Sequence, residues 1–226
     1  MGGVTPSGHA GGHAADRIQT LCEACVQETN VDGAGLAILA TDGTPEPVYV
    51  SDPRSRLIED LQFTLGEGPC MDAVSSGAPV LVDDLRALVD RAHRWPAFSG
   101  EVEPTGVRAV FAFPIRIGAV ALGTLDLYRD SPGGLSTREL GLALKTVDRA
   151  GALLLDLGAS TLDAAVEPTY RMVVHQAAGM VMAQLDTTVD VALARLRAAA
   201  YGEDIPINEL AKDVVSGRRR FSEERK

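Results

Sequence analysis

The sequence is poor in aromatic residues, which make up only 4% of its 226 positions. Any hydrophobic core must therefore be built mainly from Ala, Val and Leu. No stretch approaches the ~18 uninterrupted apolar residues of a membrane span, so no membrane contact is expected. There are only three cysteines, an odd number, and Cys22 and Cys25 lie close together on an expected helix. A disulfide framework is therefore not expected. The small number of cysteines favours a cytoplasmic location.

Catalytic motifs are also missing. The sequence has no G-x-S-x-G, no P-loop and no H-E-x-x-H, and no Cys/His/Asp constellation stands out. His93 and His175 fall in different expected domains, without carboxylates nearby in sequence. We therefore expect a protein that is not an enzyme and that needs no cofactor.

One pattern could in principle bind zinc. His9 and His13 with Cys22 and Cys25 form H-x3-H…C-x2-C, which would supply four ligands. Cysteines at this spacing on an apolar helical face are more often small core residues. We therefore expect no metal site.

Basic residues are fewer than acidic ones, 21 against 31, which gives a net charge of −10. An acidic surface repels phosphates, so the total argues against nucleic-acid binding. The excess is unevenly distributed, however. Residues 167–226 hold nine acidic and nine basic residues, so residues 1–166, with 22 acids and 12 bases, carry the whole −10. The neutral C-terminal segment remains compatible with RNA.

The hydrophobic pattern predicts an α+β domain followed by a helical one. Val107–Ile117 and Val120–Tyr128 read as two strands of a hairpin around Gly118, and Ala34–Ala40 reads as another buried strand. Helices are expected between the strands, which is typical of an α+β antiparallel sheet domain. The expected organisation is a flexible tail (1–13), a sheet domain (14–158), a three-helix bundle (160–217) and a basic, polar tail (218–226).

A long helix is expected from Thr137 to about Val166, connecting the two domains within residues 130–166. Ser136 and Glu139 form a capping box at its start. Its leucine-rich stripe is wide and needs more than one partner surface. Pairing with a second copy is the simplest way to cover it, so the sequence predicts a homodimer.

Several motifs of the sheet domain together resemble a GAF domain over about residues 16–156. They are Leu65–Cys70 (LGEGPC), Gly77-x-Pro-Val, Val82–Leu85, Gly106–Ile115 and Gly123–Tyr128. The resemblance implies a sheet with a small-molecule pocket on one face and signalling through the flanking helices. It does not imply a particular ligand.

Four residues are candidates for such a ligand pocket. Gly66 and Gly68 could expose backbone N–H groups to a ligand, although glycines at such a turn more often serve tight packing. Trp95 and Phe98 could cover the pocket, although a core position is the favoured interpretation. Cys70 could sense redox state, although a buried cysteine is more often inert.

The C-terminal helices resemble an ANTAR domain over about residues 165–217. The matching residues are Arg171–Met182 (RMVVHQAAGMVM), followed by Ala192, Leu196, Arg197, Ala200, Ile207, Leu210 and Ala211. The resemblance implies a dimer that binds paired hairpin loops in nascent transcripts and prevents a terminator from forming. Ala178 stands where the family has a lysine, which removes a phosphate-binding charge.

Six residues are candidates for RNA contact. On the first helix, Arg171 and His175 belong to a row separate from the expected core row, which contains Val174, Ala177 and Val181. On the second helix, Arg197 and Tyr201 lie one turn apart, and a cation beside an aromatic ring suits unpaired loop bases. Gln176 and Gly179 complete the expected RNA-binding set. The alternative is that these residues are a solvated helix flank.

The sequence thus favours a sensory domain that controls an RNA-binding bundle in transcription antitermination. A rival hypothesis is a dimeric GAF scaffold whose helical tail binds a protein. A DNA-binding bundle is a third, but Ile205-Pro206-Ile207 at the start of its last helix is a poor base-reading sequence.

Overall fold

The centre of the structure is a β-hairpin. In this computed structural model, β4 (Ala109–Ile117) and β5 (Val120–Arg129) pair antiparallel around Gly118, whose φ is 59°. Glycine reaches this left-handed conformation without steric cost. The structure describes residues 9–40, 43–89, 94–165, 171–203 and 205–222. They form two compact units, 1–167 and 168–226, within these described ranges.

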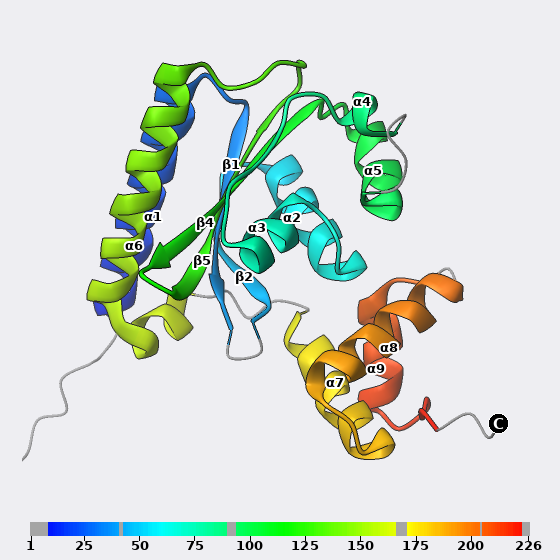
Figure 1. Cartoon of the computed structure of the whole chain (residues 1–226). Coiled ribbons are helices and arrows are strands. Elements are labelled where there is room, and N and C mark those ends of the chain that lie inside the picture. The colour runs from blue at the N-terminus through cyan, green and yellow to red at the C-terminus, as the bar shows by residue number, and fades with distance from the viewer. Residues whose placement is uncertain (1–8, 41–42, 90–93, 166–170, 204, 223–226) are drawn as a thin grey trace, which may run out of the picture. The chain divides into compact units, whose positions relative to one another are not determined.

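The hairpin belongs to a five-stranded antiparallel sheet with the order β2-β1-β5-β4-β3. The other strands are β1 (Gly33–Leu39), β2 (Pro45–Val50) and β3 (Val80–Val82). Helices α1 (His9–Thr29) and α6 (Thr137–Ala165) lie side by side on one face of the sheet (Figure 1).

The other face is covered by four shorter helices (Figure 1). These are α2 (Pro53–Leu65), α3 (Pro69–Ser76), α4 (Leu85–Val89) and α5 (Pro96–Val102), followed by the 3-10 turn Glu103–Thr105. Because successive strand residues point to opposite faces, β4 and β5 contribute to two separate cores. Phe111, Phe113, Leu125 and Leu127 pack towards α1 and α6, whereas Val110, Ala112 and Tyr128 pack towards the short helices.

The C-terminal unit consists of α7 (Arg171–Leu185), α8 (Val189–Gly202) and α9 (Ile207–Val215). Its core is made largely of fully buried aliphatic side chains, including Val174, Val181, Leu196, Leu210 and Val214. In the described part of the chain, no helix is long and apolar enough to cross a membrane.

The segment after α9 continues along this unit. The backbone N–H of Phe221 donates to Gln184 of α7 at 2.8 Å. The guanidinium of Arg218 donates to Asp213 at 2.9 Å, and Arg219 pairs with Glu203. Three residues of the expected basic tail, Arg218, Arg219 and Phe221, therefore contact the helices, and residues 223–226 lie outside the described ranges.

The α+β class, the hairpin and the long helix are confirmed, but some boundaries differ from expectation. Helix α1 begins at His9, inside the expected tail, because extending an existing helix adds one hydrogen bond for each residue fixed. Helix α4 was not predicted. Thr188 caps α8, accepting from the backbone N–H of Val191, and Gly202 is the last residue of the helix.

Much of the apolar stripe of α6 is covered within the same chain, by α1 and by the sheet. Ala143, Ala150 and Leu153 are buried in this core. Leu144 and Leu155 stay 42% and 55% exposed. Helix α1 and the sheet thus cover part of the stripe that the sequence argument assigned to a second copy, and the homodimer stays a prediction.

Arg129, at the end of β5, holds the ends of both long helices. Its guanidinium donates to the carbonyl oxygens of Thr29 at 2.9 Å and Asn30 at 3.0 Å, where α1 ends. It also donates to the carbonyl oxygen of Gly134 at 3.1 Å and to Glu139 Oε1 at 2.8 Å, where α6 begins. One buried cation therefore joins the sheet to α1 and α6.

The carboxylate of Glu139 completes the predicted capping box. Its Oε2 accepts from the backbone N–H of Ser136 at 2.7 Å, and its own N–H donates to Ser136 Oγ at 3.3 Å. The hydrogen bonds from Ser136, together with Arg129, lower the pKa of Glu139 below its ordinary value.

This arrangement predicts a pH-dependent effect of Glu139→Gln. Because the folded-state pKa is lowered, the carboxylate stabilises the fold above an unfolded pKa of ~4.3 and stops doing so as the pH falls through the folded pKa. Urea unfolding should show a loss of about 1–3 kcal/mol at pH 7 and a smaller loss at pH 3. Glu28→Gln, an exposed change on α1, is the control. Equal losses from Glu139→Gln at both pH values would contradict the assignment.

Candidate functional site

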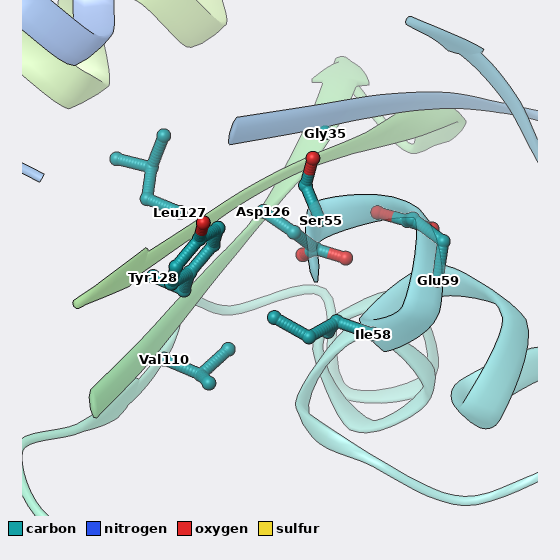
Figure 2. Close-up of a pocket in the computed structure, with 8 residues that line it drawn as sticks. All are labelled: Gly35, Ser55, Ile58, Glu59, Val110, Asp126, Leu127 and Tyr128. Atoms are coloured by element: carbon teal, nitrogen blue, oxygen red, sulfur yellow. The ribbon is translucent and has the colours of Figure 1, made fainter. Parts of the chain in front are cut away.

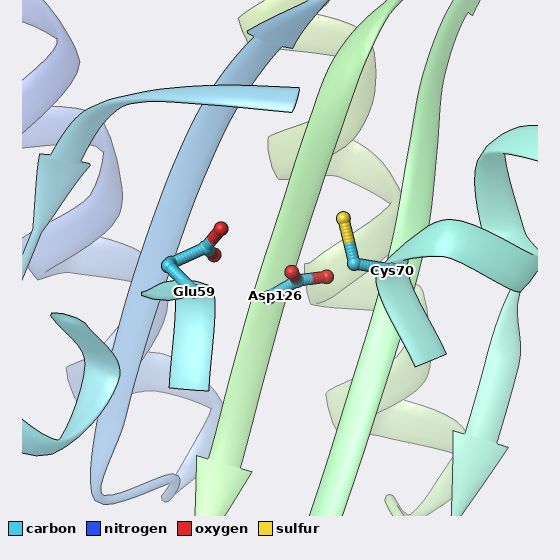
Figure 3. Close-up of side chains that lie close together, drawn as sticks. All are labelled: Glu59, Cys70 and Asp126. Atoms are coloured by element: carbon cyan, nitrogen blue, oxygen red, sulfur yellow. The ribbon is translucent and has the colours of Figure 1, made fainter. Parts of the chain in front are cut away.

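A cluster of polar side chains is buried between the sheet and the helices α2 and α3. It contains Glu59 and Gln62 of α2, Cys70 of α3, and Thr124 and Asp126 of β5. Each is at most 5% exposed. Figure 3 shows Glu59, Cys70 and Asp126 approaching one another from three different elements. An otherwise apolar layer thus contains a compact polar centre, which we call the buried polar cluster.

Gln62 links two members of this cluster. Its Nε2 donates to Asp126 Oδ2 at 3.3 Å, and its Oε1 accepts from the backbone N–H of Cys70 at 2.6 Å. Cys70 Sγ lies 3.3 Å from Thr124 Oγ1, within hydrogen-bonding distance for sulfur. The amide therefore fixes α3 and β5 relative to α2.

Burial strongly favours the neutral forms of these acidic groups. It raises the pKa of Asp126 to about 6, against the opposing effect of Glu59, Cys70 and Gln62. Burial also raises the pKa of the Cys70 thiol well above its ordinary value, and the charges of Asp126 and Glu59 add to the effect. Burial therefore disfavours the thiolate form of Cys70.

A small cavity adjoins the cluster (Figure 2). It is lined by Gly35, Ser55, Ile58, Glu59, Val110, Asp126, Leu127 and Tyr128, and its volume is about 10 Å³. That is roughly the space one water molecule requires, whereas pockets for organic ligands measure roughly 300–1,000 Å³. In this conformation the cavity accommodates a very small ligand.

Gly35 makes this packing possible. A Cβ atom at this position would lie 2.5 Å from Glu59 Oε1. Since neither β1 nor the buried side chain of Glu59 can easily move away, the carboxyl group reaches the cluster only because residue 35 has no side chain. This close approach explains the glycine in the middle of a strand.

Three residues of the LGEGPC motif, Gly66, Glu67 and Gly68, have structural roles. Gly66 ends α2 with a φ of 68°, and Gly68 precedes α3 with a φ of 139°. A Cβ on Gly68 would also lie 2.7 Å from the side chain of Gln62. Glu67 Oε1 accepts from the backbone N–H groups of Ala97 and Phe98, both at 2.8 Å, at the start of α5. The motif therefore shapes the connection between the helices that cover the cluster.

The four predicted pocket residues lie apart from the cavity. Trp95 and Phe98 are 5% and 0% exposed and pack edge to face in the core beneath the short helices, with ring centroids 6.3 Å apart. Gly66 and Gly68 are not among the residues that line the cavity within the described chain. This arrangement favours the packing interpretation of all four, and their contact with a ligand stays a prediction.

Cys22 and Cys25 are core residues on the opposite face of the sheet. Both are at most 1% exposed, and burial raises the pKa of each thiol above its ordinary value. This is the position that the spacing of the two cysteines favoured. The side chains of His9 and His13 lie outside the described ranges.

In the C-terminal unit, the buried face of α7 is wider than predicted. Arg171 and Ala178 are 1% and 0% exposed, on the same side as Val174, Ala177 and Val181. The expected separation of the Arg171 row from the core is therefore wrong, because α7 packs against both α8 and α9. A lysine in place of Ala178 would have to extend out of this core.

The other RNA-binding candidates differ in exposure. Gln176 is exposed, and His175, Gly179 and Arg197 are partly buried. Tyr201, at 73%, is the most accessible of the large hydrophobic side chains in the described part of the chain. The aromatic ring, more than the arginine beside it, is therefore presented to solvent.

The buried polar cluster was missed from sequence. Asp126 gave the only usable signal, since an acidic residue between Leu125 and Leu127 interrupts an otherwise apolar strand centre. Glu59 and Gln62 look like ordinary polar positions of an amphipathic helix. Their burial depends on how α2 docks on the sheet.

Comparison with protein families agrees with this architecture. The family model described as GAF domain matches residues 14–154, more than half of the chain. The chain belongs to the GAF domain family. A second model, ANTAR domain, matches residues 162–215. The GAF and ANTAR domains are both regulatory domains, and the predicted fold class is confirmed.

Solved structures share the fold of the GAF domain. One is a domain from a two-component sensor histidine kinase protein of Sinorhizobium meliloti, with 18% identity, a TM-score of 0.50, and coverage of 63% of this chain and 91% of that one. Another is a GAF domain/HD domain protein of Geobacter sulfurreducens, with 12% identity, a TM-score of 0.50, and coverage of 69% and 97%. A comparison with curated protein sequences found no significant match.

The role of Glu67 predicts a defined stability effect. Glu67→Ala removes the acceptor for two backbone N–H groups at the start of α5, so it should cost about 1–2 kcal/mol in urea unfolding. Glu101→Ala, an exposed change on the same helix, should stay within roughly 0.5 kcal/mol of wild type. Equal effects of the two changes would show that Glu67 does not cap α5.

Proposed function

We propose that the protein is a regulator in which the GAF domain controls RNA binding by the ANTAR domain, and that it acts in transcription antitermination. The proposal is carried by the presence of both domains in one chain. The charge distribution supports it, since the segment from Glu167 is neutral while the preceding part carries the excess of acid. The RNA partner would be hairpin loops of nascent transcripts.

In this proposal, Tyr201 is the main contact for loop bases. Its exposed ring offers a stacking surface, and such stacking contributes about 1–3 kcal/mol per base. Arg197, His175, Gln176 and Gly179 supply polar or close backbone contacts. Arg171 belongs to the proposed set. Because its side chain is buried, its proposed role is to position α7 for the residues that contact RNA.

Control by the GAF domain requires a signal with different affinities for two arrangements of the chain. The face of the sheet with the buried polar cluster is the proposed place for that signal. The opposite face carries α1 and α6, and α6 precedes the ANTAR domain in the chain.

The RNA interface is tested by comparing two variants of α8. Tyr201→Ala removes the exposed ring with little structural cost, so crosslinking in cells should lose double-hairpin leader RNAs by roughly tenfold, as expected from the loss of one stacked base. Arg195→Ala is the matched control, because this exposed cation lies about 200° around the helix from Arg197. It should retain the RNAs.

Failure to recover any RNA with wild type at low salt would exclude the RNA-binding role. It would favour the alternative in which the helical tail binds a protein. The exposed side chains of Met172, Met182 and Val191, at 64%, 38% and 46%, are the observation that supports this alternative. Recovery of duplex DNA instead of RNA would indicate the DNA-binding variant.

A homodimer is part of the proposal. Leu144 and Leu155 of α6 remain exposed and would form part of its interface. Light scattering at micromolar concentration should give twice the chain mass, and Leu144→Glu with Leu155→Glu should shift the protein towards monomer. A monomer mass for wild type would exclude the dimer.

A further inference from the structure

We propose that Glu59, Cys70 and Asp126 bind a divalent transition-metal ion within the GAF domain. One donor atom from each side chain can be chosen so that all three lie within 4.8 Å of one another. The three come from α2, α3 and β5, and their side chains lie close together (Figure 3). All three are buried.

The donor set selects the class of ion. A thiolate with two carboxylates suits zinc or ferrous iron, whereas magnesium and calcium prefer oxygen ligands alone. Three protein ligands also leave a fourth position for water or a small signal molecule. The neighbouring cavity, at about 10 Å³, provides room for such a ligand.

A second observation points to a cation ligand at this site. Asp126 is 5% exposed, and its Oδ1 has no hydrogen-bond partner in the described part of the chain. The same side chain lines the cavity (Figure 2). Buried carboxylate oxygens are normally satisfied by donors or metal ions. A bound cation would satisfy this oxygen and neutralise the neighbouring acidic groups.

The surrounding residues are arranged to position these ligands. Gln62 holds both the backbone of Cys70 and Oδ2 of Asp126. Gly35 leaves the space that Glu59 needs. A tetrahedral ion would bring its donor atoms to about 3.5 Å from one another, given bonds of roughly 2.0–2.3 Å. Binding would require the three side chains to rotate until their donor atoms reach this spacing, and Cys70 would release its thiol proton to solvent.

Zinc binding by the tag-free full-length chain tests the inference. Equilibrium dialysis with elemental analysis should find one tightly bound Zn²⁺ per chain in the presence of excess Mg²⁺. Cys70→Ser and Asp126→Asn should each weaken zinc binding about tenfold or more, and Gln62→Leu should weaken it by roughly 10–100-fold as a positioning residue. Circular dichroism confirms that each variant is folded.

Cys22→Ser is the matched control, because it removes another buried thiol from the opposite face of the sheet. It should leave zinc binding unchanged. Should Cys70→Ser fail to fold, the absorption spectrum of Co²⁺ bound to wild type tests the thiolate ligand instead. A thiolate ligand gives a sulfur-to-cobalt charge-transfer band, and the inference requires this band to persist in Cys22→Ser.

Three outcomes would overturn the inference: no zinc on wild type, undiminished zinc on folded Cys70→Ser, or loss of zinc only in Cys22→Ser. The last would assign zinc to His9, His13, Cys22 and Cys25. The inference names a ligand class for the proposed sensory domain and rests on the proposed function only for its regulatory meaning. Because zinc is measured without RNA, failure of either proposal is distinguishable from failure of the other.

Discussion

The alternation of side chains along β5 is the constraint on which the rest of the structure depends. This strand lies in the middle of the sheet, so both of its faces are covered. Leu125, Leu127 and Arg129 point towards α1 and α6, while Asp126 and Tyr128 point towards the short helices. A shift in register by one residue would place an acid in the apolar core and leucines in the polar cluster.

The two faces therefore have different physical characters. The α1–α6 face is an apolar layer whose main polar feature is Arg129, and that guanidinium is satisfied by carbonyl groups and Glu139. The opposite face keeps acidic side chains in a buried setting, where their ionisation requires compensation. The first face mainly stabilises the fold. The second face retains buried acidic groups that a purely structural core would lack. The proposed ligand sites lie on the second face for this reason.

Local sequence signals predicted the elements well where periodicity was strong. The hairpin around Gly118, the long helix after Thr137 and the capping box at Ser136 were all predictable, because each depends on neighbouring residues. The polar cluster was not, because Glu59 and Asp126 become neighbours only when α2 docks on the sheet. The burial of Arg171 was missed for the same reason, since a single helix does not show that two others cover it.

The hydrogen bonds of Arg129 have a consequence for how the domain could transmit a small displacement. Asp126 and Arg129 are three residues apart on one extended strand, a span of about 10 Å. The backbone of a hydrogen-bonded strand can hardly shorten, so β5 stiffly connects a side chain that points to one layer with a side chain that points to the other. A displacement of a fraction of an ångström at the acidic end would reach the carbonyl groups at the end of α1 and the first turn of α6 directly. The two layers are thus connected by a covalent path along β5.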